Sequence, residues 1–304
     1  MYNQFYGLRE KPFEITPDPD FLFLSENHRE ALAHLIYSAR ERKGFTVITG
    51  EVGTGKTTLV QAFLSRLDGK VKTAYIFNPK LTSIDFLRYI CEDFGLKGEQ
   101  HTKGQYVAHL HNFLLDRYSK NEQVILIIDE AQSLPPVLLE EVRLLTNLET
   151  PKSKLLQVIL IGQPELDTVL NSHPFRQLKQ RVSLRYHLKP LNEEETKQYI
   201  EKRLTNAGAI DPHFFTEKAL KKIFTYSQGI PRLINIISDH ALLAGYSENK
   251  KIIGPRMIRE AFQKVDNLPG PKERKKKRVL IGILLLMVII VLGVISFMVF
   301  ELVE

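Results

Sequence analysis

Hydrophobic and polar positions follow two different patterns along the chain, and the change falls close to Pro190. Before Pro190, short continuous apolar runs alternate with stretches whose apolar residues recur every three to four positions. Such runs are typical of strands covered by helices on both faces, and such stretches are typical of the helices. After Pro190 only the helical pattern remains. The sequence therefore predicts an α/β domain followed by a smaller all-helical domain.

The α/β part predicts a parallel sheet, because right-handed crossovers through helices connect parallel strands. Ser25 is a good N-cap for the first long helix, whereas the segment up to Pro19 is irregular and punctuated by proline. We expect strands at 44–49, 73–78, 124–129, 155–162 and 182–189. We expect helices at 26–42, 56–67, 83–95, 105–119 and 136–148.

The second part predicts a compact lid of helices with Asn, Thr, Gly or Pro at their edges. These helices are expected at 193–204, 216–226, 231–246 and 255–265. The resulting plan places the α/β domain with its N-terminal extension at 1–189, the lid at 190–265, a linker with a basic cluster at 266–278, and an apolar stretch at 279–300.

The apolar stretch from Val279 to Phe300 contains no charged residue. A helix of about 22 residues at 1.5 Å per residue spans the roughly 30 Å hydrocarbon core of a bilayer. A buried helix of this length would show a polar face, and none is present. Basic residues precede the stretch and favour the cytoplasmic side. We therefore expect a single-pass membrane protein with residues 1–278 in the cytoplasm.

The composition is that of a globular protein, with 304 residues of which 43% are hydrophobic and 25% charged. The net charge of +7 is concentrated, since residues 272–278 carry +5 and leave +2 for the rest of the chain. This distribution argues against a nucleic-acid partner and predicts contact between the cluster and anionic lipid headgroups. Cys91 is the only cysteine, which rules out an intrachain disulfide.

A complete phosphate-binding motif follows the first predicted strand, and a helix-compatible stretch follows the motif, as a P-loop requires. Backbone N–H groups of the loop would bind the phosphates, Lys56 would reach the β- and γ-phosphates, and Thr57 would ligate Mg²⁺. The motif predicts that the chain binds a nucleoside triphosphate. We expect this to be ATP, bound together with Mg²⁺. The motif reads Gly50-Glu51-Val52-Gly53-Thr54-Gly55-Lys56-Thr57-Thr58.

The apolar run Val124–Ile128 ends in Asp129 and Glu130. A carboxylate at the tip of a strand beside the P-loop can hold Mg²⁺, and the next acid can orient and deprotonate the attacking water. We therefore expect Asp129 in the metal site and Glu130 as the catalytic base. This predicts an ATPase, which converts ATP and water to ADP and phosphate.

Two further positions fit the AAA+ class of ATPases. Gln163 ends the fourth strand, where AAA+ proteins place a polar residue that senses the γ-phosphate. Arg232, in Gly229-Ile230-Pro231-Arg232, matches the start of the lid helix that presents a sensor arginine. Arginine-finger candidates precede the fifth strand: Arg181 is the first choice and Arg176 the second. A finger from a neighbouring subunit implies a homo-oligomer. Arg185 lies within the strand and is expected to be structural.

The chain resembles the ExeA/GspA secretion ATPases from Met1 to about Val265. The N-terminal block is specific to this resemblance, because AAA+ proteins in general lack it. The matching segments are Tyr2-x-x-Phe5-Tyr6-Gly7-Leu8-x-x-x-Pro12-Phe13, Pro17-Asp18-Pro19, Gly44-Phe45-Thr46-Val47-Ile48-Thr49-Gly50-Glu51, Ile128-Asp129-Glu130-Ala131-Gln132 and Ile161-Gly162-Gln163-Pro164-Glu165-Leu166.

The resemblance implies an ATPase of the bacterial inner membrane that helps to assemble or position an envelope complex of type II secretion, pilus or exopolysaccharide export. Proteins of this family continue past the membrane helix into a periplasmic peptidoglycan-binding region, whereas four residues follow Phe300 here. We therefore expect a separate inner-membrane partner protein to carry that role.

Two other functions remain open at this point. One is a nucleic-acid-linked AAA+ ATPase of the transposition or replication-initiator type, which this core also resembles. The near-neutral charge outside residues 272–278 argues against it, because DNA binding needs basic surface. The other is a nucleotide-dependent scaffold that binds ATP and scarcely hydrolyses it, and Glu130 argues against that.

Overall fold

The structure is a computed structural model. It describes residues 2–15, 21–77, 81–96, 98, 102–151 and 153–264. The predicted linker at 266–278 and the predicted transmembrane helix at 279–300 lie outside this part of the chain. Within the described part, no helix is both long enough and apolar enough to cross a membrane.

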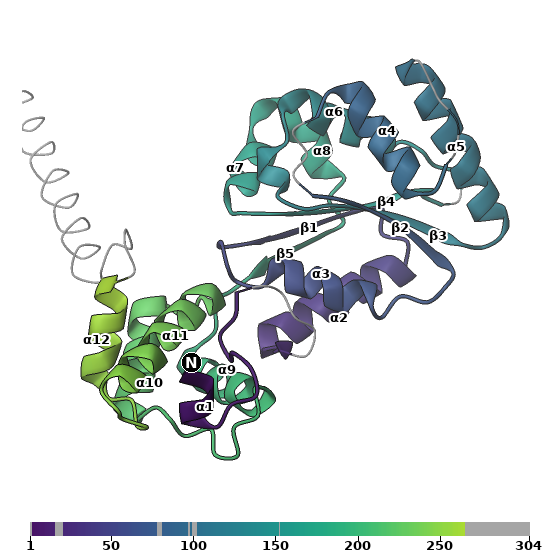
Figure 1. Cartoon of the computed structure of the whole chain (residues 1–304). Coiled ribbons are helices and arrows are strands. Elements are labelled where there is room, and N and C mark those ends of the chain that lie inside the picture. Colours follow the sequence, from purple (N-terminus) through teal and green to yellow (C-terminus); the bar gives the residue numbers. More distant parts are fainter. Residues whose placement is uncertain are drawn as a thin grey trace, which may run out of the picture.

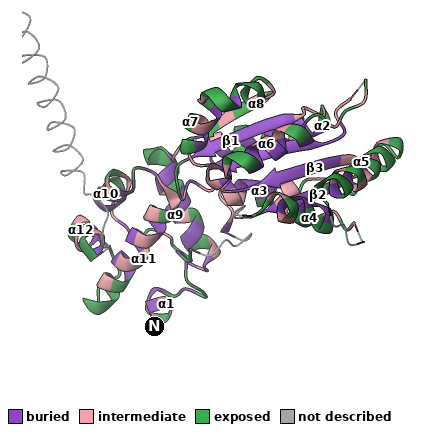
Figure 2. Ribbon diagram, turned by 90° about the horizontal axis from the view of Figure 1, so that it is seen from above, coloured by how far each residue is buried: buried purple, intermediate pink, exposed green. Residues whose placement is uncertain are grey.

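The core is a five-stranded sheet with the order β2-β3-β4-β1-β5, in which neighbouring strands pair in parallel. The central strands are nearly completely buried because their apolar runs face helices on both sides (Figure 2). The predicted parallel sheet is therefore confirmed. The strands are β1 (Phe45–Gly50), β2 (Val71–Ile76), β3 (Gln123–Ile128), β4 (Gln157–Gly162) and β5 (Leu184–Leu188).

Helices cover both faces of the sheet and form a three-layer α/β/α arrangement (Figure 1). One face carries α2 (Glu26–Arg40) and α3 (Lys56–Leu64). The other face carries α4 (Ser83–Asp93), α5 (Lys103–Ser119), α6 (Pro136–Leu145), α7 (Glu165–Asn171) and α8 (Arg176–Gln180).

The helices α7 and α8 were not predicted. They are seven and five residues long, which is too short for a helical period to stand out from the surrounding loop. Short 3₁₀ turns at Ala131–Ser133 and His173–Phe175 complete the connections on this side of the sheet.

The four lid helices are confirmed close to their predicted bounds. Their starts are fixed locally, since Asn192 and Glu195 form a capping box, Thr216 caps the second helix and Pro231 occupies the first position of the third. The helices are α9 (Glu193–Asn206), α10 (Glu217–Ser227), α11 (Pro231–Ser247) and α12 (Pro255–Lys264).

The N-terminal segment packs into the lid, and not onto the α/β domain as predicted from the sequence. It begins with a short helix, α1 (Tyr2–Tyr6), where irregular chain was expected. The Tyr6 hydroxyl donates to the carbonyl of Leu242 in α11 at 3.1 Å, and the Tyr2 hydroxyl donates to Asp239. Phe13 and Phe21 are buried in the same apolar cluster as the lid helices. The position of this segment depends on tertiary contacts, and the spacing of apolar residues along the sequence does not reveal such contacts.

Arg203 of α9 contacts Pro12, Glu14 and Phe21 of this segment. Its guanidinium donates to the carbonyl oxygens of Pro12 and Glu14, the latter at 2.9 Å. The same group lies over the ring of Phe21 at 4.7 Å from the centroid. A buried arginine with these partners ties the N-terminal segment to the lid through both hydrogen bonds and a cation–π contact.

Candidate nucleotide-binding site

The P-loop lies at the carboxyl end of β1, between Gly50 and the start of α3, as predicted. Gly53 and Gly55 have φ angles of 81° and 95°, which glycine adopts without steric cost. The Nζ of Lys56 is buried and donates to the carbonyls of Gly50 at 2.8 Å and Glu51 at 3.0 Å. The ammonium therefore sits inside the curve of the loop, where a phosphate would meet it.

Charge at Lys56 is set by two opposing effects. Burial lowers the pKa of the ammonium, whereas Glu130, Asp129 and Glu51 raise it. The two acids at the tip of β3 thus favour the charged form that phosphate binding needs.

Asp129 is fully buried at the end of β3 and accepts hydrogen bonds from two hydroxyls. Its Oδ2 lies 3.2 Å from Thr57 Oγ1 and 2.8 Å from the hydroxyl of Tyr75 in β2. A hydroxyl and a carboxylate are the hard oxygen donors that Mg²⁺ prefers, so this pair fits the predicted metal site. Tyr75 was not predicted, because an aromatic residue in a strand reads as core. Burial and the bond to Asp129 raise the pKa of its phenol.

Glu130 follows Asp129 with a φ of 52°, in the left-handed region. Its Oε2 accepts from the side-chain amides of Gln132 at 2.6 Å and Gln163 at 3.1 Å. The Oε1 of Gln132 accepts in turn from the backbone N–H of Gln163 at 2.9 Å. The structure therefore brings Gln163 to the carboxylate of Glu130, and it adds Gln132, which the sequence analysis did not single out.

Arg232 lies in the first turn of α11, and its backbone N–H donates to the carbonyl of Gly53 at 3.3 Å. The approach is close, because a Cβ on Gly53 would lie 2.6 Å from the Cβ of Arg232. The turn before the helix is held by the N–H of Leu191, which donates to the carbonyl of Gly229 at 2.9 Å. The lid thus places Arg232 beside the P-loop.

Residues of the α/β domain and of the lid line one cavity of about 330 Å³, and Asp129 and Gln163 are not among them. Lys56, Thr57, Glu130 and Arg232 contribute polar groups to its lining. Phe21, Phe23, Phe77, Leu191 and Tyr199 contribute apolar and aromatic ones. The combination suits a ligand with a charged part and a flat apolar part.

The arginine-finger candidates lie elsewhere. The N–H of Ser183 donates to the carbonyl of Phe45 at 2.8 Å, so Arg181 lies at the amino ends of the strands, while the P-loop follows their carboxyl ends. The six residues of β1 separate these edges by roughly 20 Å. Arg181 therefore does not reach the cavity of its own chain.

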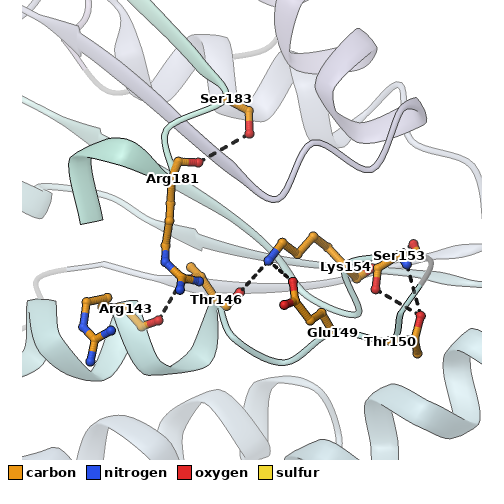
Figure 3. Close-up of polar contacts among 8 residues, drawn as sticks. All are labelled: Arg143, Thr146, Glu149, Thr150, Ser153, Lys154, Arg181 and Ser183. Carbon is orange, nitrogen blue, oxygen red and sulfur yellow. Dashed lines mark hydrogen bonds and ion pairs between the residues drawn. The ribbon is translucent and has the colours of Figure 1, made fainter. Parts of the chain in front are cut away.

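Figure 3 shows Arg181 reaching toward the C-terminus of α6, where its Nη1 donates to Thr146 Oγ1 at 3.3 Å. The ion pair of Lys154 with Glu149 lies beside this contact. Arg176 is exposed at the start of α8. Arg185 pairs with Asp167 at 3.2 Å, which agrees with the structural role expected for it.

His28 of α2 is a further residue at the site that sequence reasoning missed. Its ring is buried, lines the cavity and contacts the P-loop, with Nε2 at 2.9 Å from the carbonyl oxygen of Thr54. Its Nδ1 lies 2.7 Å from the hydroxyl of Ser25. Burial lowers the pKa of this histidine. In the sequence, a lone histidine near the start of a helix gives no signal of such a contact.

Comparison with known proteins agrees with this geometry. The family described as "AAA domain" matches residues 39–170. General secretion pathway protein A of Aeromonas hydrophila is 47% identical over 248 residues, which cover 81% of this chain and 45% of that protein. The chain therefore spans less than half the length of this relative.

Solved structures with a similar fold include ORC and Cdc6p proteins. ORC2 of Aeropyrum pernix has a TM-score of 0.61 at 18% identity, over 85% of this chain and 72% of that chain. Cdc6p of Pyrobaculum aerophilum has a TM-score of 0.63 at 18% identity, over 82% and 71%. The Drosophila ORC bound to DNA has a TM-score of 0.62 at 16% identity, over 86% and 64%. At these identities the likeness concerns the fold alone.

Proposed function

The chain belongs to the AAA ATPase family that includes general secretion pathway protein A, and on this premise we propose that it is a membrane-anchored, Mg²⁺-dependent ATPase. It would use ATP hydrolysis to assist the assembly or positioning of a bacterial envelope complex. The observation that carries the proposal is the meeting of Lys56, Thr57, Glu130 and Arg232 in one cavity.

In this proposal the P-loop binds the phosphates. Its backbone N–H groups and the N-terminus of α3 attract the negative charge, and Lys56 exchanges its carbonyl partners for phosphate oxygens. Thr57 and Asp129 would hold Mg²⁺, which supplies positive charge to the phosphates when bound. Tyr75 keeps the carboxylate of Asp129 in place through its hydrogen bond.

Glu130 would act in hydrolysis, because it can orient a water molecule and accept its proton. The two glutamine amides fix the direction of this carboxylate. Gln163 lies at the end of β4 and Arg232 at the start of the lid, so both would respond to the γ-phosphate from different domains. The hydrogen bond between Gln163 and Glu130 supports a shared role in positioning the water.

The proposal includes a homo-oligomer, which the place of Arg181 supports. The Arg181 side chain lies at the strand edge opposite to the P-loop of its own chain, so it would complete the site of a neighbouring copy. Arg176, exposed on α8, is the alternative finger.

The cellular role rests on the relative and on the sequence. The name of the relative points to secretion, and residues 272–278 and 279–300 are predicted to bind anionic headgroups and to cross the inner membrane. The α/β domain would then lie in the cytoplasm, and a partner protein in the same membrane would carry the envelope-facing role. The likeness to the ORC and Cdc6p structures, among them an ORC bound to DNA, extends only to the fold and does not favour a nucleic-acid role.

The test compares two variants of the full-length protein. Lys56→Ala should lose MgATP binding, whereas Glu130→Gln should bind MgATP and release phosphate at least 100-fold more slowly than wild type. Equilibrium binding and a phosphate-release assay measure the two effects. Hydrolysis by Glu130→Gln at the wild-type rate would show that another group activates the water.

A further inference from the structure

The hydrogen bonds around His28 define which of its nitrogens carries the proton. The oxygen of Thr54 is a carbonyl and only accepts, so Nε2 must donate to it across 2.9 Å. Nδ1 is therefore the acceptor, and the Ser25 hydroxyl donates to it at 2.7 Å. That hydroxyl also accepts from the backbone N–H of His28, as the N-cap of α2. The neutral imidazole is fixed from both sides.

The start of α2 is fixed from the lid as well. The backbone N–H of Glu26 donates to Oε1 of Glu195 at 3.1 Å. Glu195 is buried in the capping box of α9, where its Oε2 accepts from the N–H of Asn192 at 3.0 Å. His28 thus lies on a helix start that is hydrogen-bonded to both domains, and its ring is held against the P-loop by the contacts of both nitrogens.

The contact with Thr54 determines the orientation of one peptide group in the P-loop. In a trans peptide the C=O and the N–H point in opposite directions. With the Thr54 carbonyl held toward His28, the N–H of Gly55 points to the opposite side of the loop. Among the described residues, this N–H donates to no other group. The ring is also packed against Gly55 itself, because a Cβ on Gly55 would lie 2.9 Å from Nε2 of His28.

We infer that His28 is a positioning residue for phosphate binding, which turns the Thr54–Gly55 peptide so that the Gly55 N–H faces the bound phosphates. This inference rests on the nucleotide-binding function proposed above. A free Thr54 carbonyl could rotate toward the phosphates and repel them, and the donor from His28 prevents this. Because the neutral ring adds no charge, its contribution is geometric.

Two substitutions of His28 separate its nitrogens. In His28→Gln the side-chain amide reaches the position of Nε2 and can still donate to Thr54. In His28→Asn the side chain reaches only the position of Nδ1. The variant therefore keeps an acceptor for the Ser25 hydroxyl and loses the donor to the Thr54 carbonyl. His34→Asn is the control on the same helix, since His34 is half-buried, contacts Glu30 at 3.9 Å and the ring of Tyr186 at 5.5 Å between centroids, and does not line the cavity.

The test measures MgATP affinity and steady-state hydrolysis of the full-length protein. His28→Asn should raise both Kd and KM about tenfold, the effect of one buried hydrogen bond, and leave kcat unchanged. His28→Gln and His34→Asn should bind within about twofold of wild type. A merely structural role would not give a KM effect that glutamine rescues.

The tautomer of His28 provides a second measurement that does not depend on the variants. Nitrogen NMR of the wild-type protein should show the Nε2–H form. The Nδ1–H form, or wild-type affinity in folded His28→Asn, would overturn the inference. If His28→Asn does not fold, the tautomer alone decides. A wild-type protein that fails to bind MgATP would instead overturn the proposed function.

Discussion

Gln163 donates a hydrogen bond from its side-chain amide to the carboxylate of Glu130 at 3.1 Å, across the ends of the neighbouring strands β4 and β3. The same oxygen of Glu130 accepts from Gln132 at 2.6 Å. A carboxylate oriented in this way has a fixed direction relative to the P-loop. Gln163, which is expected to sense the γ-phosphate, is therefore hydrogen-bonded to Glu130, which is expected to activate the water.

We expect Gln163→Ala to bind MgATP as wild type does and to lower kcat by roughly 10- to 100-fold, because Glu130 would lose one of the groups that orient it. Binding and phosphate-release assays on the full-length protein measure this. Gln198→Ala, at an exposed position of α9, is the control and should be silent. A rise in Kd with unchanged kcat would assign Gln163 to ground-state binding.

Arg181→Ala should bind MgATP normally and hydrolyse it slowly, because Arg181 lies far from the P-loop of its own chain. Loss of an arginine finger lowers kcat by roughly 10³-fold or more. Mixing this variant with Lys56→Ala should restore part of the activity, since a mixed interface can join an intact P-loop to an intact finger.

Arg176→Ala and Arg185→Ala complete this experiment. Rescue in mixtures that contain Arg176→Ala but not Arg181→Ala would transfer the finger role to Arg176. Arg185→Ala should affect stability more than catalysis because it breaks the pair with Asp167. Absence of rescue in every mixture, with co-assembly demonstrated, would argue against a shared site.

Acidification should destabilise the folded protein partly through His28. Burial lowers its pKa in the fold, although the Thr54 carbonyl and Glu195 oppose this. The unfolded chain therefore takes up a proton near pH 6.5 that the folded chain takes up only at lower pH, and stability falls as the pH drops through this window. Between about pH 7.5 and 5.5, the free energy of unfolding of His28→Gln should fall less than that of wild type in denaturant titrations. Equal losses in both proteins would exclude this contribution.

Membrane extraction tests the predicted tether. High salt should leave the full-length protein on the membrane, and detergent should release it, because salt screens the basic cluster within a Debye length but does not remove an inserted helix. Deletion of Val279–Glu304 should release an active ATPase that no longer supports envelope assembly. Release of the full-length protein by salt, or full complementation by the deletion, would show that the stretch is not needed as an anchor.

The sheet and the lid were predictable because their signals are local. Apolar runs such as Val124–Ile128 fill both faces of a strand, and Ser25 caps α2 as expected. The boundaries differ by a few residues: β4 begins at Gln157 and not at 155, and α2 ends at Arg40 before Arg42 adopts a positive φ. The P-loop and the acidic tip of β3 were predictable because their functional residues stand at fixed positions in short sequence motifs.

The residues that sequence reasoning missed depend on contacts between distant segments. His28 meets Thr54 only after α2 packs beside the P-loop, and Tyr75 meets Asp129 only through the pairing of β2 with β3. Gln132 comes two residues after Glu130 in the chain but is recognisable only from its hydrogen bonds to Glu130 and Gln163. None of these residues breaks the pattern of its own element.

The packing of α1 against α11 has a consequence for the order of folding. Tyr2 and Asp239 are 237 positions apart, so the first residues leave the ribosome long before the residues of α11 that they contact are synthesised. The α/β domain between them can close its sheet meanwhile, and this shortens the loop whose closure entropy the final docking must overcome. Until α11 is made, Tyr2, Tyr6 and Phe13 remain exposed as an apolar segment at the start of the nascent chain, available to a chaperone.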